Sequence, residues 1–285
     1  MRKYMSTKEP YGVSHFSMLS SLLSVLNSNE EDHINVVLAK YMLEHIREIG
    51  SLSIYKIADD CFTSRSSIQR FVQHLGFDSF TALKENGVEN LAHWDKFIEY
   101  ADHPDYPNFL SQSVSKMTES INASYSKQSM ENLCELIYNS KNVLLLIAET
   151  SSSAIREFQQ GMIAFGKIMR LMTDSYGNME LITQLQPDDL ILVCSVTGNF
   201  AMGISSDLKE TTAKKALITM NRTERLTNDY SNIFYIGNEH VSRNTIQAVR
   251  GVYGRYGLTY YLDLLVNVYL EMYRNKNDQS SRREN

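Results

Sequence analysis

The sequence has little of what marks secreted or membrane-bound proteins. Its three cysteines, Cys61, Cys134 and Cys194, lie far apart and form no C-x-x-C pair, so we expect neither a disulfide framework nor a cysteine-based metal site. The longest apolar run, Val143–Ala148, is far shorter than the roughly 18 residues that a membrane span needs. No apolar core follows the basic residues at the N-terminus, so no signal peptide is predicted. These absences favour a cytoplasmic protein with reduced, buried cysteines.

An excess of positive charge is also absent. Lysine and arginine total 28 against 33 aspartate and glutamate residues, which leaves a formal net charge of −5. For the chain as a whole, this balance argues against nucleic acid as a partner. It leaves open a small nucleic-acid-binding module, because a few residues on one helix can make the contact. With 285 residues, of which 43% are hydrophobic, the chain is long enough for about two globular domains.

The first part of the chain, residues 1–91, has the apolar spacing of helices from about Phe16 onwards. The pattern predicts a helix over 34–49 that Gly50 ends, and two short helices over 53–60 and 64–75, the second of which Gly76 ends. Residues 92–125 are polar and aromatic, and they contain two of the four prolines. We predict that this segment forms a linker and a connecting helix.

From residue 126 to residue 275, short apolar runs alternate with helical patterns. The runs show no period-2 alternation, as is typical of strands buried on both faces, so an α/β domain with a central parallel sheet is predicted after the all-helical domain. A final helix over 245–274 is apolar on more than one face and could pack against another subunit, and residues 276–285 are expected to be a disordered tail. The predicted strands are 143–147, 168–172, 190–194, 216–219 and 233–236.

The stretch Ile54–Gly76 is the most informative part of the chain. Its pattern predicts two short helices joined by a turn at Cys61–Thr63, with the small Ala58 where the helices cross and Ser64 as the N-cap of the second helix. The outward face of that helix carries arginine, glutamine and serine, which can bind guanine, adenine and phosphate. An α-hairpin with a solvated polar face explains the same pattern. The outward residues are Arg65, Ser66, Gln69, Arg70 and Gln73.

The same stretch contains a longer motif in register. The matching residues are Ser53, Ile54, Ile57, Ala58, Ser64, Ser66, Ile68, Arg70, Phe71, Leu75, Gly76, Phe77, Phe80, Leu83 and Lys84, with Ser67 where threonine is usual. In these residues the chain resembles the N-terminal domain of the MurR/RpiR family of bacterial transcription regulators. The resemblance implies a helix-turn-helix domain over residues 1–91 that binds a double-stranded DNA operator. The residues expected at the DNA are Ser64, Arg65, Ser66, Ser67, Gln69, Arg70, Gln73 and Lys84.

The resemblance also implies that residues 126–275 form a SIS (sugar isomerase) domain that binds a phosphosugar effector. The Gly-x-Gly-x-Ser loop of the family corresponds to 148–152, where both glycines are missing and Glu149 lies where a phosphate would approach. The second family motif, Ser-x-Ser-Gly-x-Thr, corresponds to 195–200, where Phe200 replaces the last hydroxyl residue. Hydroxyl groups that only cap helices are an equal alternative to a retained effector site. The expected effector residues are Ser151, Ser152, Ser153, Ser195, Thr197, Gly198, Asn199 and Thr219.

Together these features favour a DNA-binding regulator over an enzyme. The resemblance implies a homodimer or homotetramer that controls genes of sugar or amino-sugar metabolism, more often as a repressor, and whose operator affinity changes with the effector. A sugar-phosphate isomerase and a non-catalytic sugar-phosphate sensor are the alternatives. No catalytic residue is assigned, because nothing in the sequence brings the possible bases Glu180 and His240 together. No cofactor or metal is expected, since the histidines lack a ligand-like spacing.

Overall fold

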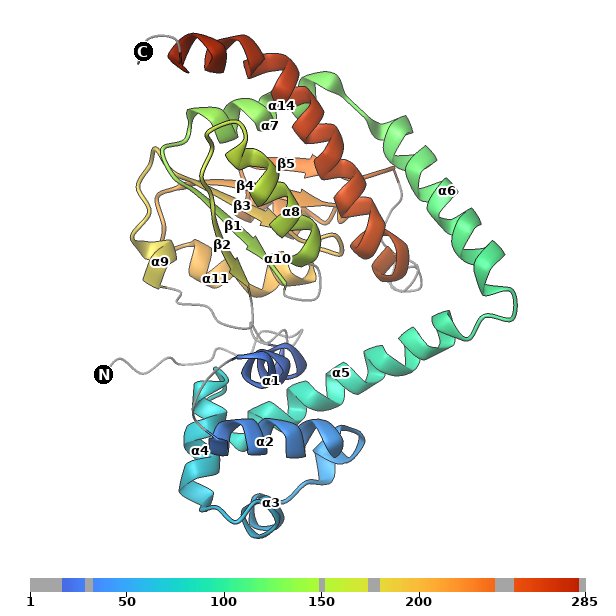
Figure 1. Ribbon diagram of the computed structural model, residues 1–285, viewed down its shortest axis with the longest axis vertical. Coiled ribbons are helices and arrows are strands. Elements are labelled where there is room, and N and C mark those ends of the chain that lie inside the picture. Colours follow the sequence, from blue (N-terminus) through green and yellow to red (C-terminus); the bar gives the residue numbers. More distant parts are fainter. Residues whose placement is uncertain (1–16, 29–32, 149–151, 174–179, 239–248, 282–285) are drawn as a thin grey trace.

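The computed structural model shows a helical domain and an α/β domain joined by two long helices (Figure 1). This fold class is the one that the sequence predicts. The structure describes residues 17–28, 33–148, 152–173, 180–238 and 249–281.

The helical domain is built around one hydrophobic core. Side chains from all of its helices contribute, and Leu38, Ile57 and Ile68 are fully buried in it. Such a core holds short helices together that would not be stable alone, because isolated helices of this length are marginal in water. Its elements are α1 (Met18–Asn27), α2 (His33–Glu44), η1 (Ile46–Ser51), α3 (Ile54–Asp60), α4 (Arg65–His74) and α5 (Phe80–Ala101).

The prediction that Gly50 ends an α-helix over 34–49 is wrong. The α-helix α2 ends at Glu44, and the chain tightens into the 3₁₀ helix η1, which runs through Gly50 to Ser51. A Cβ atom at Gly50 would lie 2.9 Å from the Val88 side chain of α5, so the glycine permits close packing against that helix. Gly76, by contrast, has a φ of 89° directly after α4, and its predicted role in ending that helix is confirmed.

The segment expected to be a linker is mostly helical. Helix α5 continues through the expected boundary at residue 91 and ends at Ala101, and α6 spans Tyr106–Ser124 with Pro107 in its first turn. Only residues 102–105 separate the two helices. In this turn the His103 ring stacks on Phe109 with the ring centroids 4.3 Å apart. The exact domain boundary stays a prediction.

The α/β domain has a five-stranded parallel sheet in the order β2-β1-β3-β4-β5. The predicted bounds are confirmed for β1 and β3, while the other three strands shift by one or two residues. Strand β2 starts after Ile168, which is 79% exposed and lies outside the sheet despite its apolar side chain. The strands are β1 (Val143–Ile147), β2 (Arg170–Thr173), β3 (Leu190–Cys194), β4 (Lys214–Thr219) and β5 (Asn232–Tyr235).

Both faces of the sheet are covered, which explains the uninterrupted apolar strands. In β1, Leu145 packs into the core on one face and Leu144 into the core on the other. The first core includes α7 (Lys127–Asn139), α8 (Ser152–Ile163) and α14 (Leu258–Ser281). The second includes side chains from α9 (Glu180–Thr183), α10 (Asn199–Gly203), α11 (Ser205–Leu208) and α12 (Glu224–Asp229).

The C-terminal part differs from the single helix predicted over 245–274. A π-helical segment, η3 (Val249–Gly257), precedes α14, and residues 239–248 lie outside the described residues. A Cβ atom at Gly257 would lie 3.1 Å from the Met117 sulfur of α6, so this wide turn packs closely on the connecting helix. Helix α14 continues to Ser281, within the predicted tail, and residues 282–285 lie outside the described residues, so the disorder of the tail stays a prediction. Extending an existing helix costs little free energy, even for polar residues. None of the described helices is long and apolar enough to cross a membrane.

Candidate functional site

The predicted helix–turn–helix is present at α3 and α4. The Ser53 hydroxyl accepts a hydrogen bond from the Tyr55 amide at 3.2 Å and caps α3. Phe62 occupies the turn with a φ of 50°, a left-handed conformation that is uncommon for a residue other than glycine, and its side chain is 97% exposed. The Thr63 amide donates to the Ala58 carbonyl at 2.9 Å, which closes the turn.

The orientation of α3 is also fixed from outside the motif. The Tyr41 hydroxyl of α2 donates a hydrogen bond to an Asp60 carboxylate oxygen at 2.5 Å. This bond is the main reason that the pKa of Tyr41 rises to about 12. Since Asp60 is the last residue of α3, the contact holds the end of that helix against α2.

A cluster of serines marks the N-terminus of α4. Ser64 is the N-cap, as predicted, because its hydroxyl accepts from the Ser67 amide at 3.1 Å. The same oxygen lies 2.7 Å from the Ser66 hydroxyl and 3.0 Å from the Ser67 hydroxyl. Ser64 and Ser66 are exposed and Ser67 is half-buried. Hydroxyl groups at an exposed helix N-terminus are suited to contact phosphate oxygens of DNA.

The two arginines of α4 are exposed but oriented by neighbours. The Arg65 guanidinium donates to the Tyr55 hydroxyl at 3.0 Å and lies 4.7 Å from the centroid of the Tyr55 ring. The Arg70 guanidinium donates to the Ser67 hydroxyl at 3.3 Å. A guanidinium has five N–H donors, so each arginine keeps further donors for a base or a phosphate. Tyr55 was missed by the sequence reasoning, since only the fold shows that it stacks against a residue ten positions later.

The other predicted DNA-binding residues have different surroundings. The Gln69 side chain is half-buried and donates to the Asp78 carbonyl at 3.3 Å, whereas Gln73 is exposed. The Lys84 amine donates to the carbonyl oxygens of Gly50 and Leu52, each at 3.2 Å. These carbonyls lie at the end of η1, so Lys84 contributes to the packing of α5 on that element. Its role at the DNA stays a prediction.

The predicted effector residues after β3 and at the end of β4 lie close together. Ser195 and Thr219 are buried, and the Asn221 side chain donates to the Thr197 carbonyl at 2.8 Å, which joins the two loops. Gly198 has a φ of 81°, and a Cβ atom there would lie 2.7 Å from that of Asn221. The family-like motif therefore forms a tight junction between neighbouring strand ends.

The hydroxyl groups at this junction are already used within the protein. The Ser195 hydroxyl accepts from the Ala201 amide at 3.2 Å, and the Thr219 hydroxyl donates to the Val196 carbonyl at 3.3 Å. The Thr197 hydroxyl accepts from the amide of Asn199 at 3.4 Å. These contacts favour the alternative in which the hydroxyls stabilise loops and helix ends. The Asn199 side chain is half-buried.

The remaining effector residues lie at the start of α8. Ser151 and Glu149 fall outside the described residues, Ser152 begins the helix, and Ser153 is exposed on its first turn. Of the two possible bases, Glu180 begins α9, and His240 lies outside the described residues. Within the described ranges, no group of three or more histidine, cysteine, aspartate or glutamate residues is arranged to hold a metal ion.

The N-terminal domain is thus of the helix-turn-helix class, with an exposed polar second helix. Residues 16–93 match the helix-turn-helix domain of the rpiR family. This part of the chain is therefore similar to that family of domains, as the sequence motif indicates.

Similar proteins include two curated relatives. The HTH-type transcriptional regulator GlvR of Bacillus subtilis is 24% identical over 185 residues, which cover 64% of this chain and 66% of GlvR. The uncharacterized HTH-type transcriptional regulator YfhH of Escherichia coli is 23% identical over 56% of this chain and 60% of its own length. The matches thus span less than two thirds of either relative. Among solved structures, one similar protein is the Vibrio vulnificus NanR protein complexed with ManNAc-6P. The match covers 93% of this chain and 97% of the NanR chain, with 17% sequence identity and a TM-score of 0.48.

Proposed function

We propose that this protein is a DNA-binding transcription regulator that reads its operator with α4. The observation that carries the proposal is the exposed N-terminus and outer face of α4, with Arg65 and Arg70 oriented by hydrogen bonds. It lies within a domain that matches the rpiR helix-turn-helix family, and similarity to regulators such as GlvR adds support. In this role α4 enters the major groove with its N-terminal residues at the bases.

We infer that two copies act together. One helix-turn-helix motif reads only a half-site, and dimers of such domains bind half-sites about one helical turn apart. The α/β domain is the part that we propose for pairing into a homodimer or homotetramer, as the resemblance implies. The described apolar side chains of α14 already pack in the chain's own core, so they do not mark the pairing surface. Regulation of transcription places such a protein with the chromosome, in the cytoplasm.

The regulated genes, on this proposal, serve sugar or amino-sugar metabolism, and the protein represses them. A phosphosugar effector would bind in the α/β domain at the carboxyl ends of the strands, where ligands of open parallel sheets bind. By preferring one arrangement of the dimer, it would shift operator affinity by its differential affinity for the two arrangements. We propose no catalytic activity.

The proposal is tested by operator binding. We expect Arg65→Ala, Gln69→Ala and Arg70→Ala each to weaken binding to an operator selected from genomic DNA, by about 1–3 kcal/mol where a base contact is lost. The measurement is a fluorescence-anisotropy titration at several salt concentrations, and wild-type affinity should fall steeply with salt because counterions are released from the DNA.

The matched control is Lys40→Ala, which removes an exposed cation of the same domain that faces Glu44 on α2. It should leave the affinity unchanged. If all three α4 variants bind the operator like wild type, α4 is not the reading helix. If no genomic fragment is bound more tightly than random DNA, the proposed function itself is wrong.

A further inference from the structure

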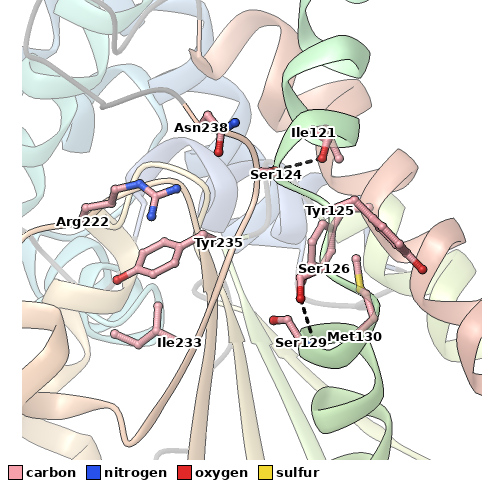
Figure 2. Close-up of a pocket in the computed structure, with 11 residues that line it drawn as sticks. Ile121, Ser124, Tyr125, Ser126, Ser129, Met130, Arg222, Ile233, Tyr235 and Asn238 are labelled. Atoms are coloured by element: carbon pink, nitrogen blue, oxygen red, sulfur yellow. Dashed lines mark hydrogen bonds between the residues drawn. The ribbon is translucent and has the colours of Figure 1, made fainter.

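A pocket of about 270 Å³ lies beside the β5 edge of the sheet, where α6 ends and α7 begins (Figure 2). None of the predicted effector residues lines it. Its walls come from distant parts of the sequence, including β5, the loops after β4 and β5, and the junction of the two helices. Only the folded chain brings these groups together.

Positive charge on one wall comes from Arg222. It is the one charged side chain among the described residues that line the pocket, so no carboxylate on the walls compensates it. Its guanidinium lies 4.1 Å from the centroid of the Tyr235 ring and donates to the Gly237 carbonyl at 2.9 Å. Figure 2 shows the guanidinium above that ring, on the side of the pocket opposite Ser126 and Ser129. Stacking and one hydrogen bond fix the group while leaving other N–H donors for a ligand.

The opposite wall is the N-terminus of α7, a helix of 13 residues. The Ser126 hydroxyl caps it by accepting from the Ser129 amide at 3.3 Å, and both serines line the pocket. A helix N-terminus carries partial positive charge and unpaired amide groups, which favour an anion. Two independent features, a guanidinium and a helix start, therefore face each other across one cavity.

The rest of the lining is mostly apolar or aromatic, and Ser124 and Asn238 add polar groups. Ile121, Ile233 and Tyr125 contribute, together with Tyr261, which is only 4% exposed. Such surfaces pack against the faces of a small ring, while polar groups at the two ends set its orientation.

We propose that this pocket binds a small anionic metabolite, a phosphate ester or carboxylate on a sugar-sized ring, with the anion between Arg222 and the start of α7. None of the predicted effector residues after β3 or at the start of α8 lines this site, although Arg222 and Asn238 lie in the loops after β4 and β5. Its occupancy does not depend on DNA binding. Its location is at the end of α6, where the Asn238 amide also donates to the Ser120 hydroxyl at 3.2 Å. A ligand there would contact the helix that leads back through residues 102–105 to the helical domain.

The test is isothermal titration calorimetry of the full chain without DNA, with inorganic phosphate, glucose 6-phosphate and glucose as probes. We expect saturable binding of the two anions and none of glucose. Arg222→Gln, which removes the charge, should weaken anion binding at least about tenfold, as expected for a lost charge-assisted contact. Ser129→Met keeps every charge but fills the pocket, and it should weaken glucose 6-phosphate binding by a similar factor.

Two controls make the assignment specific. Lys209→Gln removes an exposed cation elsewhere on the domain and should bind like wild type. The pair Ser152→Ala with Thr197→Ala alters the predicted effector loops and tests whether the anion binds there instead. The proposal is overturned if neither anion binds at millimolar concentration, or if Ser129→Met and a folded Arg222→Gln retain wild-type affinity. Loss of binding in the strand-end pair alone would assign the anion to those loops instead.

Discussion

Lys84 and Arg65 are both basic residues of the helical domain, Arg65 at the start of α4 and Lys84 on α5, but their surroundings differ. The Arg65 side chain stacks on an exposed tyrosine, whereas the Lys84 amine is held by two backbone carbonyls at the end of η1. The sequence presents both simply as cations in a helical pattern. Which of them remains available to DNA depends on what lies beside each one after folding.

This difference leads to a prediction for Lys84→Met. Loss of two charge-assisted hydrogen bonds to carbonyls should lower the free energy of unfolding by about 1–2 kcal/mol, measured by urea denaturation. The slope of the logarithm of the operator-binding constant against the logarithm of the salt concentration should not change. If the magnitude of that slope falls by about one, Lys84 contacts a DNA phosphate instead. As a control, Lys40→Met removes only an exposed pair 3.8 Å from Glu44 and should change stability by a few tenths of a kcal/mol.

Among the secondary-structure elements, those that the sequence predicted best are the ones with a purely local or fully buried signal. Strands β1 and β3 lie in the centre of the sheet, and their apolar runs match the observed bounds. The other three strands begin at polar residues, Arg170, Lys214 and Asn232, which an apolar run does not mark. The 3₁₀ helix at 46–51 and the π-helical segment at 249–257 were missed, since both depend on packing against α5 and α6 rather than on local periodicity.

Replacing glycine by alanine should have opposite effects on stability at two different positions. Gly198 has a φ of 81° and lies against Asn221, so Gly198→Ala combines left-handed strain, about 1–2 kcal/mol, with a steric clash. Gly161 lies in α8 with open space around it, and Gly161→Ala should stabilise by about 0.5–1 kcal/mol because alanine is the better helix former. The measurement is the melting temperature of each variant in thermal denaturation. If Gly198→Ala changes the melting temperature in the same way as Gly161→Ala, the loop at Gly198 relaxes freely.

For the whole molecule, the central feature is that the buried side chains form separate cores. One core belongs to the helical domain, and two others cover the faces of the sheet. The connection between the domains runs through α5, residues 102–105 and α6. Residues in different cores therefore share few partners, and their energetic effects should be independent.

We expect Leu38→Ala and Leu192→Ala to lower different thermal transitions in scanning calorimetry. Both side chains are fully buried, the first in the helical domain and the second in the sheet. Each substitution should cost about 2–5 kcal/mol in its own domain and leave the other transition in place. A single transition that shifts equally in both variants would show that the two domains unfold as one cooperative unit.

The sequence by itself determined the class of each domain, the helix–turn–helix at 54–76 and the N-cap at Ser64. These features depend on hydrophobic periodicity and on hydrogen bonds between neighbours in the chain, so they can be predicted from the sequence. Tertiary structure alone decided that Tyr55 orients Arg65, that the motif hydroxyls after β3 and β4 bond inward, and that Arg222 faces the start of α7. The physical reason is that these arrangements involve groups from separate elements and loops, and only the packing of those elements brings the groups together.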